Sequence, residues 1–257
     1  MTYKRNKLKT AWDITQRIQN WPTAFGLRVF RHRPGLRMLN LRNGLNIVCR
    51  GGTRDWDVIH ELLFAGGYGR AMEYLKRQSG QPTVLDLGGN IGLFSLLAAS
   101  SHTSAKVVAF EPGPPNFRLF EINRLANPSL GGRIELRKEA VAGHTRTTEW
   151  SFDELNPGGS GLYAVGGAKF PVQIRAFAEA MASISGQVAL AKIDIEGAEF
   201  ELLAETPAEV WQRIDAISLE LHDDPAGKTS QAEFIKVMAG HGFRVEEESV
   251  CSYFLHR

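Results

Sequence analysis

The chain comprises 257 residues, of which 43% are hydrophobic and 23% charged, and its net charge is +2. This composition is ordinary for a soluble globular protein and excludes collagen-like and intrinsically disordered chains. No apolar run approaches the roughly 18 residues that a membrane span needs, and the N-terminus lacks the apolar segment of a secretory signal. We therefore expect a cytoplasmic protein. The two cysteines, Cys49 and Cys251, have no spacing that predicts a disulfide framework or a zinc site.

Charge is divided unevenly along the chain. Residues 1–50 contain eleven Lys and Arg residues against one acid, Asp13, so this segment carries +10 and the remainder −8. The positive charge of the N-terminal segment favours a negatively charged partner. Equally, the basic segment could fold back onto the acidic remainder of the protein. Because Trp12 and Trp21 suit an interfacial helix, we predict peripheral contact of the N-terminus with anionic lipid at the inner face of the membrane. The sequence leaves the oligomeric state open.

Residues 1–80 are predicted to form a basic, mainly helical extension on the substrate side of the protein. An amphipathic helix is expected around Trp12, Ile14, Ile18 and Trp21, and it should end at Pro22. A strand is predicted over 45–50. A helix is predicted over 55–76, with a break at the glycine pair 66–67.

Residues 81–257 follow a different pattern, in which short apolar strands alternate with helical segments. Strands are expected over 83–88, 106–112, 133–141, 188–197, 214–224, 243–248 and 251–257, and helices over 91–100, 114–126, 198–205 and 231–240. Strands of continuous apolar character are buried on both faces, so the alternation predicts a parallel α/β sheet with helices on both sides. Between 143 and 186 the pattern loosens, which indicates an insertion or hairpin near the site.

A glycine-rich turn follows the first strand of this region. Gly88, Gly89 and Gly92 let a ligand approach the backbone at the start of a helix. Glu111, at the end of the next strand, is placed to accept hydrogen bonds from ribose hydroxyls. Asp86 precedes the glycines and would repel a pyrophosphate, but it suits the ammonium of a methionine-like group, directly or through water. The turn therefore predicts S-adenosylmethionine rather than a dinucleotide, with Asn90 as a further cofactor contact or only a helix cap.

Three motifs in order resemble the FkbM family of methyltransferases: DLGGNIG at 86–92, FEP at 110–112 and KIDIEGAE at 192–199. The resemblance covers roughly residues 40–257. It implies a Rossmann-like class I methyltransferase fold with a seven-stranded sheet. It also implies O-methylation of a sugar, glycolipid or natural-product hydroxyl. Carried over by position, it implies cofactor contacts at Asp86, Gly88, Gly89, Asn90, Gly92, Glu111, Pro112, Asn116, Glu139 and Ala140.

Polar residues at the ends of two later strands are candidates for catalysis. Lys192 and Asp194 alternate with apolar neighbours, Glu196 follows, and Glu220 and His222 repeat the spacing on the next strand. A general base chosen from Asp194, Glu196 and His222 would assist a hydroxyl nucleophile. Two alternatives stay open. The carboxylates could bind Mg²⁺, or Lys192 could simply neutralise Asp194 while Glu199 and Glu201 are solvated on a helix.

Rival functions are less well supported by the sequence. The basic N-terminus keeps an RNA methyltransferase as the alternative, although the chain lacks an Asn/Asp-Pro-Pro-aromatic motif and a strand-end Pro-Cys pair. A dehydrogenase would need GxGxxG, and a scaffold without activity would not need Asp194 and Glu196. The glycine-rich segment 158–161, with Ser160, could fold over a substrate or be a plain turn.

Overall fold

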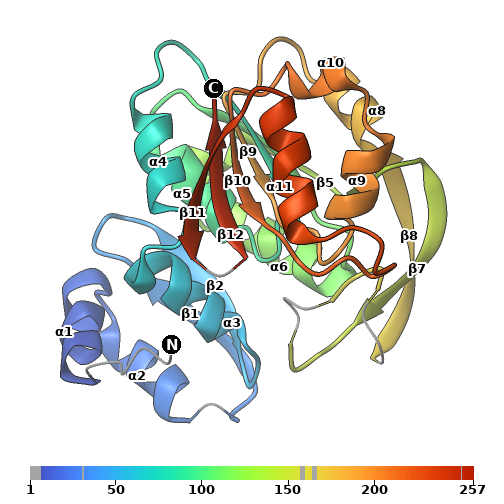
Figure 1. Ribbon diagram of the computed structural model, residues 1–257. Coiled ribbons are helices and arrows are strands. Elements are labelled where there is room, and N and C mark those ends of the chain that lie inside the picture. Colours follow the sequence, from blue (N-terminus) through green and yellow to red (C-terminus); the bar gives the residue numbers. More distant parts are fainter. Residues whose placement is uncertain (1–6, 31, 157–159, 164–166, 250) are drawn as a thin grey trace.

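The computed structural model describes residues 7–30, 32–156, 160–163, 167–249 and 251–257. Its centre is a seven-stranded sheet in the order β11-β12-β10-β9-β3-β4-β5 (Figure 1). Strand β12 runs antiparallel to both of its neighbours, and the other described pairings in this sheet are parallel. The predicted mostly parallel α/β sheet is therefore confirmed. Its strands are β3 (Thr83–Leu87), β4 (Lys106–Phe110), β5 (Ile134–Arg137), β9 (Leu190–Ile193), β10 (Ala216–Glu220), β11 (Arg244–Ser249) and β12 (Ser252–His256).

Alternate residues of the buried strands face two separate apolar clusters. Leu85, Ile193 and Ile217 lie in a cluster with residues of α8 (Phe177–Ala182), α9 (Glu199–Glu205), α10 (Ala208–Trp211) and α11 (Gln231–Gly240). Val84 and Leu190 face the opposite cluster, formed with α4 (Gly69–Lys76), α5 (Leu93–Ser101) and α6 (Pro114–Leu125). Burial on both faces explains why these strands read as continuous apolar runs. The short helix α7 (Pro128–Gly131) precedes β5.

The N-terminal part contains α1 (Lys7–Arg17), α2 (Trp21–Val29), β1 (Gly35–Asn40), β2 (Asn46–Gly51), α3 (Asp55–His60) and a π-helical turn η1 (Glu61–Ala65). The predicted helix does not run on to Pro22. It ends at Arg17, and Pro22 instead lies in the first turn of α2, where the missing N–H of proline is tolerated. Strands β1 and β2 form an antiparallel hairpin, and the predicted break at Gly66 is confirmed by its left-handed φ of 84°.

A second, smaller sheet lies beside the main one. Strands β7 (Arg146–Phe152) and β8 (Ala168–Ala176) pair as an antiparallel hairpin, and β6 (Ala140–Ala142) adds to β8 in parallel. The hairpin lies within the segment 143–186, where an insertion or hairpin was expected. Its strand β7 forms one side of the cavity described below. Within the described residues, no helix is both long and apolar enough to cross a membrane.

Candidate functional site

The turn between β3 and α5 is held tightly against its surroundings. Gly88 has a φ of +79°, and a Cβ atom on it would lie 1.9 Å from the backbone oxygen of Asp194. A Cβ on Gly89 or Gly92 would lie 2.7 or 2.3 Å from the ring of Phe120. Such separations are far shorter than any real contact, so these positions require glycine. Gly88 also lines the cavity described below, whereas Gly89 and Gly92 are required by packing and not, as expected, by ligand approach.

Asn90 and Glu111 are joined at the top of this turn. The backbone N–H of Asn90 donates to Glu111 Oε2 at 2.7 Å, and that of Gly113 donates to Oε1 at 2.8 Å. Burial raises the pKa of Glu111 to about 7, although these two bonds act in the opposite direction. Asn90 adopts a left-handed φ of 48°, a conformation that non-glycine residues adopt at an energetic cost and that is frequent at functional sites.

Asp86 does not reach the cavity. Its carboxylate is fully buried beneath the turn, where it accepts a hydrogen bond from Ser95 Oγ at 2.5 Å and lies 3.8 Å from Lys192 Nζ. Burial raises its pKa, and the Lys192 charge opposes that shift. Asp86 does not line the cavity, so a direct contact with the cofactor ammonium is not supported, and a contact through water stays a prediction. Its Oδ1 is buried without a hydrogen-bond partner among the described residues.

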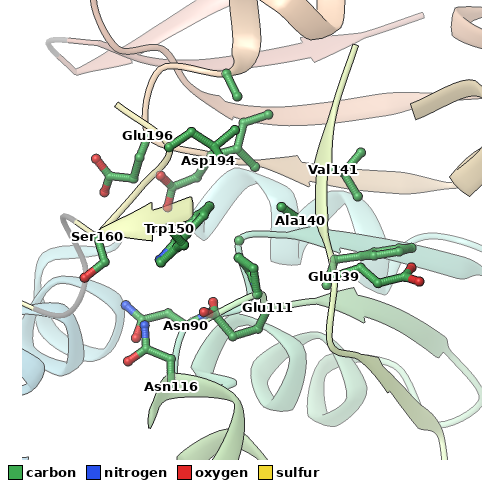
Figure 2. Close-up of a pocket in the computed structure, with 16 residues that line it drawn as sticks. Asn90, Glu111, Asn116, Glu139, Ala140, Val141, Trp150, Ser160, Asp194 and Glu196 are labelled. Atoms are coloured by element: carbon green, nitrogen blue, oxygen red, sulfur yellow. The ribbon is translucent and has the colours of Figure 1, made fainter. Parts of the chain in front are cut away.

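The main cavity lies at the carboxyl ends of β3, β4 and β9 and encloses about 540 Å³ of empty space, partly open to solvent. This is where open α/β sheets bind ligands. In Figure 2, Asp194 and Glu196 lie on one side of the cavity and Glu139 on the other, with Trp150 and Glu111 between them. The expected residues that line it are Gly88, Asn90, Glu111, Pro112, Asn116, Glu139, Ala140, Asp194 and Glu196.

Two of these residues are positioned by arginines outside the cavity. Arg50 Nη2 donates to the side-chain oxygen of Asn116 at 2.8 Å and is itself paired with Asp55 at 2.9 Å. Arg175 forms a two-point ion pair with Glu139 at 2.7 Å, and this bond lowers the pKa of Glu139. The Glu139 carboxylate, an expected cofactor contact, is thus anchored at the edge of the cavity.

Lys192 ties the ends of β3 and β9 together. Its ammonium donates to the backbone oxygen of Gly88 at 2.6 Å and pairs with Asp194 Oδ2 at 3.0 Å. Burial by itself would lower the pKa of Lys192, but the charges of Asp194 and Asp86 raise it. Lys192 is fully paired and does not line the cavity, so it orients Asp194 and cannot act on a substrate there.

Glu196 follows on a strained segment and faces the cavity. It has a φ of 54°, the second left-handed non-glycine residue of the site. Burial and the neighbouring Asp194 charge raise the pKa of Glu196 to about 7, despite the opposing effect of His222. A carboxylate that titrates near neutral pH is suited to proton transfer.

Glu199 is completely buried, which contradicts the expectation of a solvated helix residue. It accepts hydrogen bonds from the backbone N–H groups of Ile195 and Gly197, both at 2.9 Å, and so fixes the turn that carries Glu196. Glu201 is not solvated either, because Arg146 forms a bidentate bond to it. The predicted pair of Lys192 with Asp194, in contrast, is present.

His222 lies between two carboxylates. Its Nδ1 is 3.0 Å from Glu199 Oε1 and its Nε2 is 3.4 Å from Glu196 Oε2. Burial lowers the pKa of the imidazole, but the bond to Glu199 and the two negative charges outweigh it and raise the value to about 9. His222 is therefore protonated at neutral pH and cannot serve there as the general base that the sequence allowed.

One oxygen or nitrogen each from Asp194, Glu196 and His222 lies within 4.8 Å of the others, a grouping that could hold a metal ion. The protonated imidazole opposes this, because a ligating histidine must be neutral.

Sequence reasoning missed several apolar residues of the cavity. Trp150 from β7 has its indole N–H buried without a partner among the described residues, and it faces the same space as Glu111. In the sequence of β7, nothing distinguishes Trp150 from an ordinary buried strand residue. Phe110, Val141, Leu162 and Ile195 complete this wall. Ser160 also lines the cavity and accepts a hydrogen bond from the Asp153 backbone at 3.0 Å, whereas residues 158 and 159 lie outside the described residues.

An adjoining cavity opens beside the catalytic candidates. It shares Asn90, Asp194 and Glu196 with the main cavity and extends toward α3 and β10. Its other charged residues are Asp57, Glu61 and Glu220 against a single cation in the described lining, Arg54. The Asp194 charge and burial raise the pKa of Glu220 to about 7. This space is large enough for an acceptor and is acidic.

Comparison with known proteins places this geometry in context. The model of the family described as "Methyltransferase FkbM domain" matches residues 86–245. A relative from Streptomyces tacrolimicus, "31-O-demethyl-FK506 methyltransferase FkbM", is 27% identical over 194 residues, covering 64% of this chain and 74% of the relative.

Two solved structures are similar in fold. The METTL16 methyltransferase domain aligns with a TM-score of 0.51 and 13% identity over 98% of this chain and 95% of that one. The FkbM methyltransferase from Methylobacillus flagellatus aligns with a TM-score of 0.48 and 12% identity, covering 71% of this chain. This chain spans about half of that structure, 48% of its length.

Proposed function

This chain belongs to the FkbM family of methyltransferases, which use S-adenosylmethionine, and we propose that it methylates a hydroxyl oxygen of a sugar, glycolipid or natural-product acceptor. The observation that carries this proposal is the shared cavity: Asn90 and Glu111 of the cofactor half line the same space as Asp194 and Glu196. A methyl donor and an acceptor hydroxyl could therefore meet in one enclosed place, which is the main requirement of a displacement reaction.

The cofactor half has polar atoms that need a partner. Asn90 Oδ1 and Trp150 Nε1 are buried without a hydrogen bond within the described protein, and such atoms are costly unless a ligand satisfies them. Glu111 and Asn116 add a carboxylate and an amide, as a ribose with two hydroxyls requires. When bound, S-adenosylmethionine supplies a methyl group on a positively charged sulfur. These residues fit that group.

Glu196 is the residue that we assign as general base. Its carboxylate lines both the main cavity and the acidic acceptor cavity, so it reaches the boundary where a hydroxyl would lie. It accepts the hydroxyl proton while the oxygen attacks, which prevents a positive charge from building on that oxygen. His222 remains protonated, and its positive charge, close to Glu196, keeps the carboxylate in position.

Asp194 has a supporting part. Its pairing with Lys192 fixes it beside Glu196, and its negative charge keeps the proton affinity of Glu196 high. Asp194 also lines both cavities, so an acceptor hydroxyl could donate a hydrogen bond to its carboxylate. Two carboxylates at this boundary can bind neighbouring hydroxyls of a polyol.

The acidic acceptor cavity favours a neutral hydroxyl compound over RNA. Asp57, Glu61 and Glu220 line it together with the two catalytic carboxylates, and a phosphate backbone would be repelled there. The relative from Streptomyces carries an O-demethylated acceptor in its name, which supports oxygen as the methyl acceptor in this family. The described basic residues between 7 and 50, part of the segment that motivated the RNA alternative, do not line this cavity.

A transfer assay with isotopically labelled S-adenosylmethionine tests the proposal. Purified protein is incubated with a panel of glycan, glycolipid and macrolide acceptors and, in parallel, with total RNA. We expect label on a hydroxyl oxygen of a small acceptor, and its loss in Glu196→Gln. Label on RNA, or on nitrogen, would overturn the assignment, as would failure of the protein to bind the cofactor by calorimetry.

A further inference from the structure

Helix α2 exposes an apolar face although its opposite face is also apolar. Ala24 and Leu27 are buried against the rest of the N-terminal part, as expected for a packed helix. On the outer side, Trp21, Val29 and Phe30 at the helix end are 44%, 67% and 52% exposed. A surface helix ordinarily carries mainly charged or polar residues on its exposed side, whereas the exposed positions of α2 are largely apolar and Arg28 is its one charged residue.

Other exposed apolar side chains lie on α1 and β1, which contact α2. Trp12 of α1 is 65% exposed, and Leu36 and Met38 on one face of β1 are 56% and 46% exposed. Six of the eleven large apolar side chains exposed in the described residues thus fall between 12 and 38, which is a concentration rather than a scatter. Figure 1 shows α1, α2 and β1 together at one end, away from the seven-stranded sheet. We call Trp21, Val29 and Phe30 the N-terminal apolar surface.

Cations border this surface. A groove beside α2 is lined by Thr23, Phe30, Arg33 and Arg37, with the Arg33 guanidinium 4.5 Å from the centre of the Phe30 ring. Both arginines come from the segment of residues 1–50 that carries +10. Aromatic and aliphatic side chains bordered by arginines are the composition of surfaces that insert into the headgroup region of anionic membranes.

We propose that the N-terminal apolar surface docks on an anionic lipid bilayer, with Trp21, Val29 and Phe30 entering the interface and Arg33 and Arg37 contacting lipid phosphates. Charge selects this occupant over a second copy of the chain. A two-fold dimer through this surface would bring the arginines of both copies together and would be repelled. The docking does not depend on the acceptor assigned above.

A consequence follows that does rest on the proposed function. The groove beside α2 shares Leu27 with a cavity lined by Arg54 and Asp57, and those two residues also line the acidic acceptor cavity at Asp194. Shared lining residues therefore link the groove beside α2, the cavity at Arg54 and Asp57 and the acidic acceptor cavity as neighbours along one side of the protein. An acceptor anchored in lipid could present its hydroxyl at Glu196 without leaving the bilayer.

Vesicle co-sedimentation of the full chain tests the docking. The probes are vesicles of phosphatidylcholine with phosphatidylglycerol and vesicles of phosphatidylcholine alone, each at low and high salt. We expect binding to the anionic vesicles, weakened by salt because the electrostatic contribution is screened. The variant Trp21→Ser/Val29→Ser/Phe30→Ser should lose it, whereas Ile122→Ser/Leu125→Ser/Val237→Ser, changed at exposed positions elsewhere, should bind like the unchanged protein.

A charge-reversal pair keeps the test decisive if the triple serine variant unfolds. Arg33→Glu/Arg37→Glu should weaken binding by at least roughly 30-fold, since each basic residue near the surface contributes about fivefold. Arg77→Glu/Arg118→Glu has the same change of net charge at exposed positions elsewhere and should bind much more tightly than the Arg33 and Arg37 variant. Circular dichroism checks the fold of each protein.

Three results would overturn the proposal. The first is that the unchanged protein does not co-sediment with anionic vesicles at low salt. The second is that the surface variants bind as tightly as their matched controls. The third is self-association in the ultracentrifuge that the serine variant abolishes, which would make the surface a protein interface. Methyl transfer to a water-soluble acceptor should be unchanged in all surface variants. Failure of docking is thereby separate from failure of the proposed function.

Discussion

His222 Nδ1 lies 3.0 Å from the carboxylate of Glu199, a residue with no exposed surface that also accepts two backbone hydrogen bonds from the 195–197 turn. The buried negative charge keeps His222 protonated to a pH of about 9, as its raised pKa shows. The imidazolium in turn lies 3.4 Å from Glu196. A structural carboxylate thus determines the charge state of a histidine, and the histidine holds the residue that we assign as the base.

Replacement of Glu196 by Gln should lower kcat by about 100- to 10,000-fold, the usual contribution of a general base. Affinity for S-adenosylmethionine should remain within about twofold, because the cofactor residues on the other side of the cavity are unchanged. Steady-state kinetics and calorimetry measure the two quantities, and Glu209→Gln, at an exposed position, is the control. A kcat close to that of the unchanged enzyme would remove Glu196 from the role of base.

The pH profile of kcat/KM for the acceptor, at saturating cofactor, should be bell-shaped. Glu196 accepts a proton only when ionised, so activity should rise as pH passes its pKa of about 7. Activity should fall again above about 9, where His222 loses its charge. In His222→Gln the acidic limb should move to higher pH, because the cation that lowers the pKa of Glu196 is gone. An unmoved acidic limb would contradict this coupling.

Cofactor affinity should depend on the Asn90 side chain. Asn90→Gly keeps the left-handed backbone, which glycine adopts without strain, but it removes the unpartnered Oδ1. We expect about tenfold weaker binding of S-adenosylmethionine with an unchanged melting temperature. Glu111→Gln should weaken binding at least as much. If calorimetry gives the same Kd for Asn90→Gly and the unchanged protein, Asn90 is only a turn residue.

The glycine turn should tolerate no side chain at position 88. Gly88→Ala brings a Cβ within 1.9 Å of the Asp194 backbone at a φ of +79°, and we expect a loss of about 3 kcal/mol or more in the free energy of unfolding. Gly44→Ala is the matched control, because its φ of +91° imposes backbone strain while nothing lies within 4 Å. That variant should lose only about 1–2 kcal/mol. Urea titrations compare them, and equal losses would show that the contact with Asp194 is relieved cheaply.

Chelation should leave the activity intact. In the metal-free protein the raised pKa of His222 keeps a proton on the imidazole at neutral pH, and a metal would have to displace that proton, so we expect the Asp194, Glu196 and His222 grouping to work as a proton-transfer site. Dialysis against EDTA and subsequent addition of Mg²⁺ should each change kcat by less than about twofold. A large loss with EDTA that Mg²⁺ restores would favour the metal alternative instead.

Much of the fold was predictable because its determinants are local in sequence. Continuous apolar strands, helix-forming segments and the strained glycine turn after Leu87 each carry their own signal, and together they specify a parallel sheet with a ligand site at its carboxyl edge. Residues at strand ends, such as Glu111, Asp194 and Glu196, were predictable for the same reason. Pro22 was misread because proline ends one helix and begins another with equal ease.

The sequence by itself determined the family, the sheet and the edge where chemistry occurs, since motifs and periodicity depend on neighbours along the chain. The tertiary structure alone decided which polar groups are paired or buried. It buried Asp86 beneath the turn and Glu199 in the core, and it placed His222 beside Glu199, which keeps the imidazole protonated. It also brought Trp150 from a hairpin into the cavity. It also left the outer face of α2 uncovered. Burial and proton affinity depend on contacts between residues distant in sequence, and such contacts exist only in the folded protein.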